Sequence, residues 1–436
     1  MSADARTLIN RSPMHPLQVV VVLITVGLNA LDGFDIASIS FASPGISEEW
    51  GVSRGALGIV LSMELIGMCV GSILLGGFAD KYGRRPTILG CLVVMAFGMM
   101  LATTSKSVID LSIWRIVTGL GIGGMLAATN AVAAEFSNDA RRHFFVSLMV
   151  IGYPIGIFVG GAIIRPLLAD YNWRTIFYFG AFATALFIPL VYFFVPESIH
   201  WLARKQPVNA LERINKTLQR FKFTPVDSVP VLTEEAQKHS LSELFKGGLL
   251  FTTIAVTAAY FFHITTFYFI IKWTPQIVAD MGFPPVTAGS VLNWSTVGGA
   301  LGGALFGSLT FKFGLKPLTL VVLALSVITI IAFGNSPKDI VILSVLAAIG
   351  GFTTNAGVVG LYTIFAHVFP THLRAFGTGF AIGVGRGGAA LSPIIAGFLF
   401  EAGKGLAVVA TVMALGSLLA AIVLVFLKLR AAVETD

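Results

Sequence analysis

Charged side chains are scarce in this sequence. Only 12% of its 436 residues are Asp, Glu, Lys or Arg and 56% are hydrophobic, whereas a soluble domain carries about 25% charged residues. This composition excludes an ordinary soluble globular protein and predicts an integral membrane protein. The net charge of +7 does not indicate a nucleic-acid partner, because the excess Lys and Arg residues fall in the loops of one side.

Cysteine is also rare, and the motifs of enzymes are missing. Cys69 and Cys91 both lie in apolar runs, which excludes a disulfide framework and a cysteine metal site. The glycines of Gly119-x-Gly121-x-Gly123 lie inside an apolar run with no strand before them, so they are not a dinucleotide fingerprint. The sequence contains no nucleophile–base pair, nucleotide loop or metal-ligand spacing. We therefore expect no enzyme, no cofactor and no metal.

Long apolar runs, in contrast, are abundant. Each can cross a bilayer as a helix, which takes about 20 residues. The first six are 17–42, 56–78, 86–104, 109–134, 144–168 and 175–195, and the second six are 249–271, 286–309, 317–333, 340–366, 375–398 and 406–427. The sequence predicts an all-α membrane protein with 12 transmembrane helices. Its expected parts are a tail (1–16), a six-helix bundle (17–195), a linker with an amphipathic helix (196–248), a second six-helix bundle (249–427) and a tail (428–436).

The distribution of Lys and Arg predicts the orientation. With the N-terminus in the cytoplasm, the cytoplasmic loops, linker and tails hold 20 Lys and Arg residues and the outer loops hold six. The outer six are Arg54, Lys106, Arg174, Lys272, Lys338 and Lys404. We therefore expect both termini in the cytoplasm. The polar start runs directly into the first span, so we expect no cleavable signal peptide.

The two halves repeat each other. A glycine-rich, charged loop follows the second apolar run and returns 231 residues later, after the eighth. The two loops are Gly76-x-x-x-Asp80-Lys81-x-Gly83-Arg84-Arg85 and Gly307-x-x-x-Phe311-Lys312-x-Gly314-Leu315-Lys316. Glu135 and Arg142 match His367 and Arg374 at an offset of 232. A duplicated six-helix unit places a substrate site between the halves, near the middle of the membrane.

Two acids stand in the middle of the first apolar run. Asp32 and Asp35 are three residues apart, so they share one helix face. A carboxylate at this depth costs roughly 2.5 kcal/mol or more, so the pair must face protein or a water-filled cavity. They are either structural acids bonded to neighbouring helices or a proton site, and we favour the second. Glu64 and Arg115 lie at similar depth, and Arg115 could favour proton release when a gate closes.

Arg386 falls near the middle of the eleventh run, among glycines. Its planar fork suits a carboxylate, so we expect it to bind an anionic substrate. The alternative is a structural tie to Glu64, Asp32 or Asp35. Further candidates for substrate binding are Asp35, Tyr153, His263, Phe267, Asn293, Asn355 and Tyr362.

Charged residues at the cytoplasmic ends of the helices are candidates for a gate. Gly83 permits a tight turn, and Asp80 can pair with arginines or with a helix N-terminus. Such pairs could latch the halves together. The gate candidates are Asp80, Arg84, Arg85, Glu135, Arg142 and Arg374.

These motifs resemble those of the major facilitator superfamily. The loop from Gly76 to Arg85 is similar to its signature loop, and Arg115-x-x-x-Gly119-x-Gly121-x-Gly123 to its fourth-helix motif. Gly152-Tyr153-Pro154-x-Gly156 looks like a loose version of its fifth-helix motif, and Pro196-Glu197-Ser198-x-x-Trp201-Leu202 resembles its sugar and organic-acid branches. The resemblance implies two pseudo-symmetric six-helix bundles. His367, Phe311 and Leu315 depart from the pattern of the second half, which implies a weaker latch there.

A narrower resemblance is to the aromatic acid:proton symporter family. It rests on Asp32-Gly33-Phe34-Asp35, Phe369-Pro370-Thr371-x-x-Arg374 and Gly383-Val384-Gly385-Arg386-Gly387-Gly388. Members import benzoate-type carboxylates in bacteria, and the family's first-helix acids and eleventh-helix arginine correspond to Asp32, Asp35 and Arg386. Sialate and niacin-type transporters are similar in the first helix.

The resemblance implies a monomeric importer of a small aromatic anion and a proton in a bacterial inner membrane. The alternatives are a symporter of a sugar acid or other organic anion, an exporter, and a transporter-like receptor.

Overall fold

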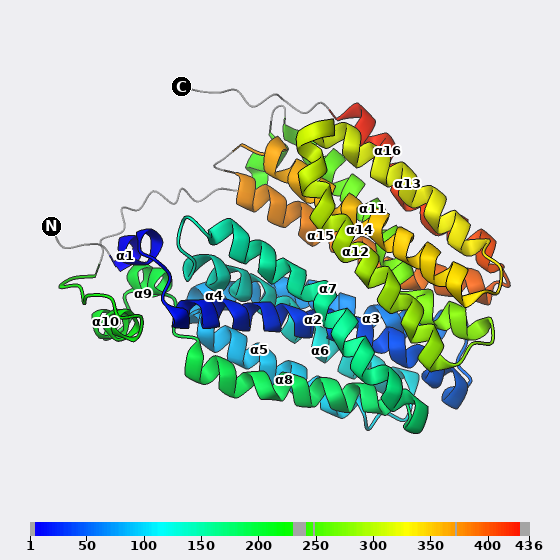
Figure 1. Ribbon diagram of the computed structural model, residues 1–436, viewed down its shortest axis with the longest axis horizontal. Coiled ribbons are helices and arrows are strands. Elements are labelled where there is room, and N and C mark those ends of the chain that lie inside the picture. Colours follow the sequence, from blue (N-terminus) through cyan, green and yellow to red (C-terminus); the bar gives the residue numbers. More distant parts are fainter. Residues whose placement is uncertain (1–4, 230–240, 247–248, 371–372, 428–436) are drawn as a thin grey trace.

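A computed structural model of the protein describes residues 5–229, 241–246, 249–370 and 373–427. Two groups of helices lie side by side (Figure 1). The first half holds α2 (Pro16–Trp50), α3 (Arg54–Leu74), α4 (Gly76–Tyr82), α5 (Arg84–Ala102), α6 (Val108–Glu135), α7 (Arg142–Asp170) and α8 (Arg174–Phe194). The second half holds α11 (Leu249–Asp280), α12 (Pro285–Phe313), α13 (Leu315–Gly334), α14 (Ile340–Val368), α15 (Arg374–Glu401) and α16 (Leu406–Phe426).

Eleven helical spans of the described residues are long and apolar enough to cross a membrane. They agree with eleven of the apolar runs in the sequence. The run 286–309 forms α12, which has 29 residues but is not among the eleven, because Gly, Ser, Thr and Asn make up much of it. The count of 12 spans therefore stays a prediction.

The first helix of each half is longer than predicted. We expected the spans to end at Ala42 and Ile271, but α2 continues to Trp50 and α11 to Asp280. Each helix contains a proline, Pro44 or Pro275, and the two are 231 residues apart, which is the offset of the repeat.

The sequence around Pro44 compensates for its missing N–H. Pro44 cannot donate a hydrogen bond to the carbonyl of Ser40, and the hydroxyl of Ser43 donates to that carbonyl instead (2.8 Å). At the start of α2, His15 and Gln18 form a capping box, and the helix ends at Gly51 with φ +57°. α2 therefore continues through the segment from Ser43 to Trp50, beyond the predicted end of the span at Ala42.

A small cluster lies at one end of the molecule. It contains α1 (Ala5–Arg11), α9 (Ile199–Lys205) and α10 (Ala210–Arg220) beside the start of α2 (Figure 1). Ile9, Leu202 and Leu218 are buried in it. We call this end the terminal end, and the opposite end, where α2 ends and α3 begins, the distal end. The predicted amphipathic linker helix is α10, and the 3₁₀ helix η1 (Leu241–Phe245) precedes α11.

The two halves are in close contact at the distal end. Arg54 on α3 forms an ion pair with Asp280 on α11 (2.7 Å). Gly58 on α3 lies against α15, and a Cβ atom there would be 2.4 Å from the carbonyl oxygen of Pro393. The halves are therefore packed backbone against backbone at this end, which only a glycine allows.

Candidate functional site

Asp32 and Asp35 lie inside the protein, as their positions in the sequence predict. Both side chains are buried, and none of their four carboxylate oxygens has a hydrogen-bond partner among the described residues. Between them, Gly33 allows α2 and α7 to approach, because a Cβ atom there would be 2.1 Å from the carbonyl oxygen of Tyr153. Two buried carboxylates without partners are unusual and point to a site that binds something else.

A buried ion network lies beside these acids. Glu64 on α3 forms an ion pair with Arg115 on α6, and Arg115 also donates to the backbone oxygen of Asp35 (2.8 Å). On its other side, Glu64 lies 3.5 Å from the Nζ of Lys272 on α11. All three charged side chains are 0% exposed. The network joins the two halves, since Lys272 belongs to the second.

The placement of Lys272 corrects the sequence analysis. We expected it in an outer loop, but it lies inside α11 and is fully buried. It also donates to the backbone oxygen of Ile36 on α2. A signal was present in the sequence: Trp273, Ile277 and Val278 follow it, so the apolar pattern continues beyond the lysine.

Arg386 on α15 also reaches across to the first half. Its Nη1 donates to the hydroxyl of Ser72 on α3 (2.7 Å). No ion pair joins Arg386 to Glu64, Asp32 or Asp35 within the described part of the chain, so the structural tie that we considered is absent here. Arg386 instead lines a small cavity of about 180 Å³, with Tyr268 among the other lining residues.

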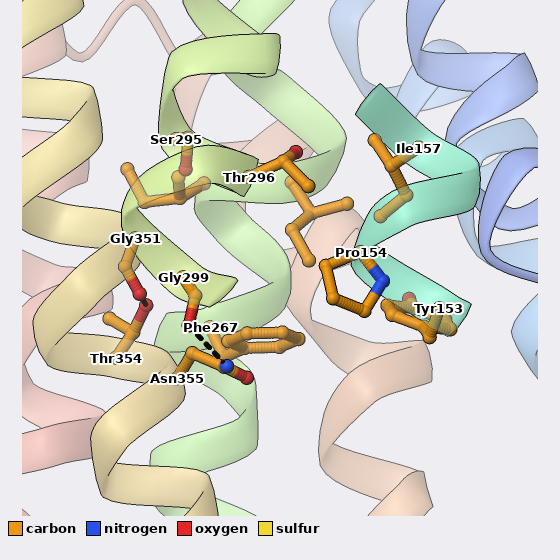
Figure 2. A pocket seen from close by; sticks show the side chains of 12 residues that line it. Tyr153, Pro154, Ile157, Phe267, Ser295, Thr296, Gly299, Gly351, Thr354 and Asn355 are labelled. Carbon is orange, nitrogen blue, oxygen red and sulfur yellow. Dashed lines mark hydrogen bonds between the residues drawn. The ribbon is translucent and has the colours of Figure 1, made fainter. Parts of the chain in front are cut away.

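A larger pocket lies between the halves. Its empty volume is about 390 Å³, part of which is open to solvent, and α7, α11, α12 and α14 each contribute three residues to its wall. Phe267 lies across it, with Asn355 and Gly299 on one side and Tyr153 and Pro154 on the other (Figure 2). The full lining is Tyr153, Pro154, Ile157, Phe267, Ile270, Ile271, Ser295, Thr296, Gly299, Gly351, Thr354 and Asn355.

Three of the predicted substrate-binding residues therefore line this pocket: Tyr153, Phe267 and Asn355. The amide nitrogen of Asn355 donates to the backbone oxygen of Gly299 (2.6 Å), and its side-chain oxygen points away from Gly299 (Figure 2). The sequence analysis did not identify Ser295 and Thr296, because small polar residues are common in packed membrane helices.

Three other predicted substrate-binding residues lie outside the pocket lining. Both ring nitrogens of His263 are hydrogen-bonded, to the hydroxyl of Ser417 (2.9 Å) and the backbone oxygen of Thr354 (2.8 Å). Asn293 donates to the backbone oxygen of Phe158 in the other half (3.4 Å). The hydroxyl of Tyr362 is 3.0 Å from that of Tyr260. Of the three, His263 has the contacts of a structural residue.

The predicted gate loop contacts α9, because the indole N–H of Trp201 donates to the backbone oxygen of Asp80 (3.0 Å). Arg84 pairs with Asp80 (2.8 Å) and Glu135 (3.6 Å). Gly83, at φ +111°, has no room for a Cβ atom, because Glu197 lies against it.

Glu197 explains part of the signature loop. Its carboxylate accepts from the backbone N–H of Arg84 (2.8 Å), at the start of α5, where helix N–H groups have no partner within the helix. Burial raises the pKa of Glu197, against the effect of its backbone hydrogen bonds. The sequence analysis quoted this residue within a motif but gave it no role.

The remaining gate candidates lie near the terminal end. Arg85 bonds the backbone oxygen of Tyr192 and lies over that ring, 4.9 Å from its centre. Arg142 pairs with Asp139 (2.8 Å), and Arg374 is exposed at the start of α15. The predicted latch between the halves stays a prediction.

Known proteins share this architecture. A family model described as the Major Facilitator Superfamily matches residues 25–292 and 256–435. The chain belongs to this superfamily. The predictions of a multi-pass membrane transporter, and not an enzyme, are therefore confirmed. The inward-open xylose transporter XylE from E. coli has the same fold, with a TM-score of 0.72, 19% identity and coverage of 96% of this chain and 98% of that one.

Three curated relatives are similar to this chain along most of their length. The gallate transporter of Pseudomonas putida is 25% identical over 96% of this chain and 94% of its own length. The 4-hydroxybenzoate transporter PcaK of Pseudomonas putida is 27% identical over 89% and 88%, respectively. The benzoate transport protein of Acinetobacter baylyi is 27% identical over 91% and 87%.

Proposed function

We propose that this protein imports a small aromatic carboxylate together with a proton, by alternating access, across a bacterial inner membrane. The names of the relatives support the substrate class. The protein would act as a monomer, with 12 spans and with both termini in the cytoplasm. In this arrangement α12 crosses the membrane among the other helices of its half, and its central polar side chains, Asn293, Ser295 and Thr296, are buried.

The observation that carries the substrate class is the pocket around Phe267. The pocket lies between the halves, where a duplicated six-helix unit places its substrate site, and Phe267 offers a flat surface for stacking. The next residue, Tyr268, lines the small cavity beside Arg386. We infer that the aromatic ring lies against Phe267 and the carboxylate against Arg386, with Tyr268 at the boundary.

The charges of the site support coupling to a proton. The acids Asp32, Asp35 and Glu64 are balanced by the cations Arg115, Lys272 and Arg386. A substrate carboxylate that enters this buried cluster brings one negative charge too many, which is costly in a medium of low dielectric constant. One proton on Asp32 or Asp35 restores neutrality. Entry of the anion therefore favours entry of a proton.

The closed distal end supports an inward-facing state. The Arg54–Asp280 ion pair and the contact of Gly58 hold the halves together there. With the terminal end in the cytoplasm, rocking of the halves opens the site to the outside and to the inside in turn.

A thermal-shift series on the purified protein tests the substrate class. We expect 4-hydroxybenzoate, benzoate and gallate to raise the melting temperature. Cyclohexanecarboxylate has a carboxylate and a similar size but no aromatic ring, so it should shift the melting temperature less. A rise of the melting temperature with gluconate and none with the benzoates would contradict an aromatic substrate and favour a sugar acid.

A further inference from the structure

Lys272 occupies an unusual place in the ion network. It lies on α11 and reaches into the first half, where it contacts the backbone oxygen of Ile36 on α2 and the carboxylate of Glu64 on α3 (3.5 Å). Its repeat counterpart is Phe41, so the first half has no equivalent cation. Glu64 is thus shared between Lys272 of the second half and Arg115 of the first.

The contacts of Arg115 do not change with the position of one half relative to the other. It is on α6 and binds Asp35 on α2 and Glu64 on α3, which all belong to the first half. When the halves rock as rigid bodies, these distances are kept. We expected Arg115 to favour proton release when a gate closes, but contacts that stay within one half do not favour that role.

The contacts of Lys272, in contrast, cross the boundary between the halves. They exist only while the distal end is closed, since α11 moves with the second half. Opening of the distal end takes the ammonium group away from Glu64. The first half then keeps Asp32, Asp35 and Glu64 with Arg115 as the cation of the network, and carries a surplus of two negative charges.

We propose that Lys272 ties proton binding to the conformation of the transporter. When the distal end opens, Lys272 withdraws and water delivers a proton to the acids of the first half. When the distal end closes, Lys272 returns to Glu64, and the proton leaves to water on the terminal side. The lysine and the proton are thus alternative counter-charges for the same acids. This proposal rests on the proposed proton-coupled transport.

Two transport assays in proteoliposomes separate coupling from binding. Accumulation of labelled 4-hydroxybenzoate under a pH gradient requires coupling, whereas exchange of labelled for unlabelled substrate at equal pH does not. We expect Lys272→Gln to keep exchange within about threefold of wild type. Its accumulation ratio should fall by at least tenfold, to about that of protein-free liposomes.

Three variants serve as controls. Lys272→Arg keeps the cation and should keep accumulation. Lys404→Gln makes the same change at an exposed lysine near the distal end and should behave as wild type. The double variant Glu64→Gln/Lys272→Gln leaves neither partner of this pair charged, and we expect exchange without accumulation.

The outcomes distinguish the two proposals. If wild type itself shows no accumulation under a pH gradient, the proposed function fails. If wild type accumulates and Lys272→Gln accumulates equally, the role of Lys272 is overturned. The role is also overturned if Lys272→Gln and the double variant Glu64→Gln/Lys272→Gln each lose exchange to the same extent as accumulation, because the lysine then serves folding or substrate binding.

Discussion

At the scale of single residues, the site combines one arginine, Arg386, with two buried acids, Asp32 and Asp35. Arg386 reaches the first half through a neutral hydroxyl, that of Ser72, and so is not bound in an ion pair with the acids nearby. Asp32 and Asp35 have no hydrogen-bond partner within the described residues. The proposed function assigns the cation to the anionic substrate and the acids to the proton, and both lie inside the protein, as their positions in the sequence predict.

Replacement of Arg386 tests its role as the carboxylate anchor. Lysine keeps the charge but loses the planar fork, so we expect Arg386→Lys to weaken binding of 4-hydroxybenzoate about tenfold, and Arg386→Ala to abolish it. Isothermal titration calorimetry measures this. Ser72→Ala removes the partner of the arginine in this state and should change the affinity little. Unchanged affinity of Arg386→Ala would make the arginine structural.

Asn355 tests how the pocket distinguishes hydroxylated rings. Asn355 lines the pocket, and its side-chain oxygen can accept a hydrogen bond from a ring hydroxyl, so we expect Asn355→Leu to weaken binding of 4-hydroxybenzoate by about 1–2 kcal/mol. Benzoate, which has no hydroxyl, should lose much less. Competition binding with both ligands gives the difference. An equal loss for both would mean that Asn355 supports the shape of the pocket only.

At the scale of elements, the long first helix of each half is the main departure from the sequence prediction. The predicted spans end at Ala42 and Ile271, but the helices continue through a proline to Trp50 and Asp280. In α2, Ser43 bonds the carbonyl that Pro44 leaves without a donor. In α11, the added length includes Lys272. Helix ends near prolines are therefore better predicted with the neighbouring hydroxyl side chains taken into account.

Ser43 should contribute measurably to stability. Ser43→Ala leaves the buried carbonyl of Ser40 without its donor, so we expect a loss of about 1 kcal/mol. Ser38→Ala is the matched control: its hydroxyl bonds the carbonyl of Asp35 (2.6 Å), to which Arg115 also donates. Thermal unfolding in detergent compares the two variants. A larger loss for Ser38→Ala than for Ser43→Ala would contradict this explanation.

At the scale of the whole molecule, the sequence predicts the number and order of apolar segments, the repeat and the family. It also predicts that Asp32, Asp35, Glu64 and Arg115 lie together, because their depths follow from helix geometry. It cannot predict which partner each charge takes, since that depends on how the halves pack. For this reason the sequence places Lys272 in a loop, and it leaves open whether His263 binds substrate or makes structural hydrogen bonds.

Gly58 tests the movement of the halves. A Cβ atom there meets the carbonyl oxygen of Pro393 at 2.4 Å, so we expect Gly58→Ala to favour the state with an open distal end. Spin labels at Lys106 and Lys404 lie at the distal end, one in each half. Double electron–electron resonance should then show a longer distance between them. Gly77→Ala, where a Cβ atom meets nothing within 4 Å, is the control. An unchanged distance would contradict closure through this contact.

The most direct test of the central claim is to measure whether protons enter with the substrate. Proteoliposomes with a pH-sensitive dye inside receive 4-hydroxybenzoate outside, and protein-free liposomes correct for diffusion of the uncharged acid. We expect the interior to acidify with one proton per substrate, and Asp32→Asn and Asp35→Asn to lose this response. Entry of the substrate without acidification, or acidification equal to wild type in both variants, would contradict the claim.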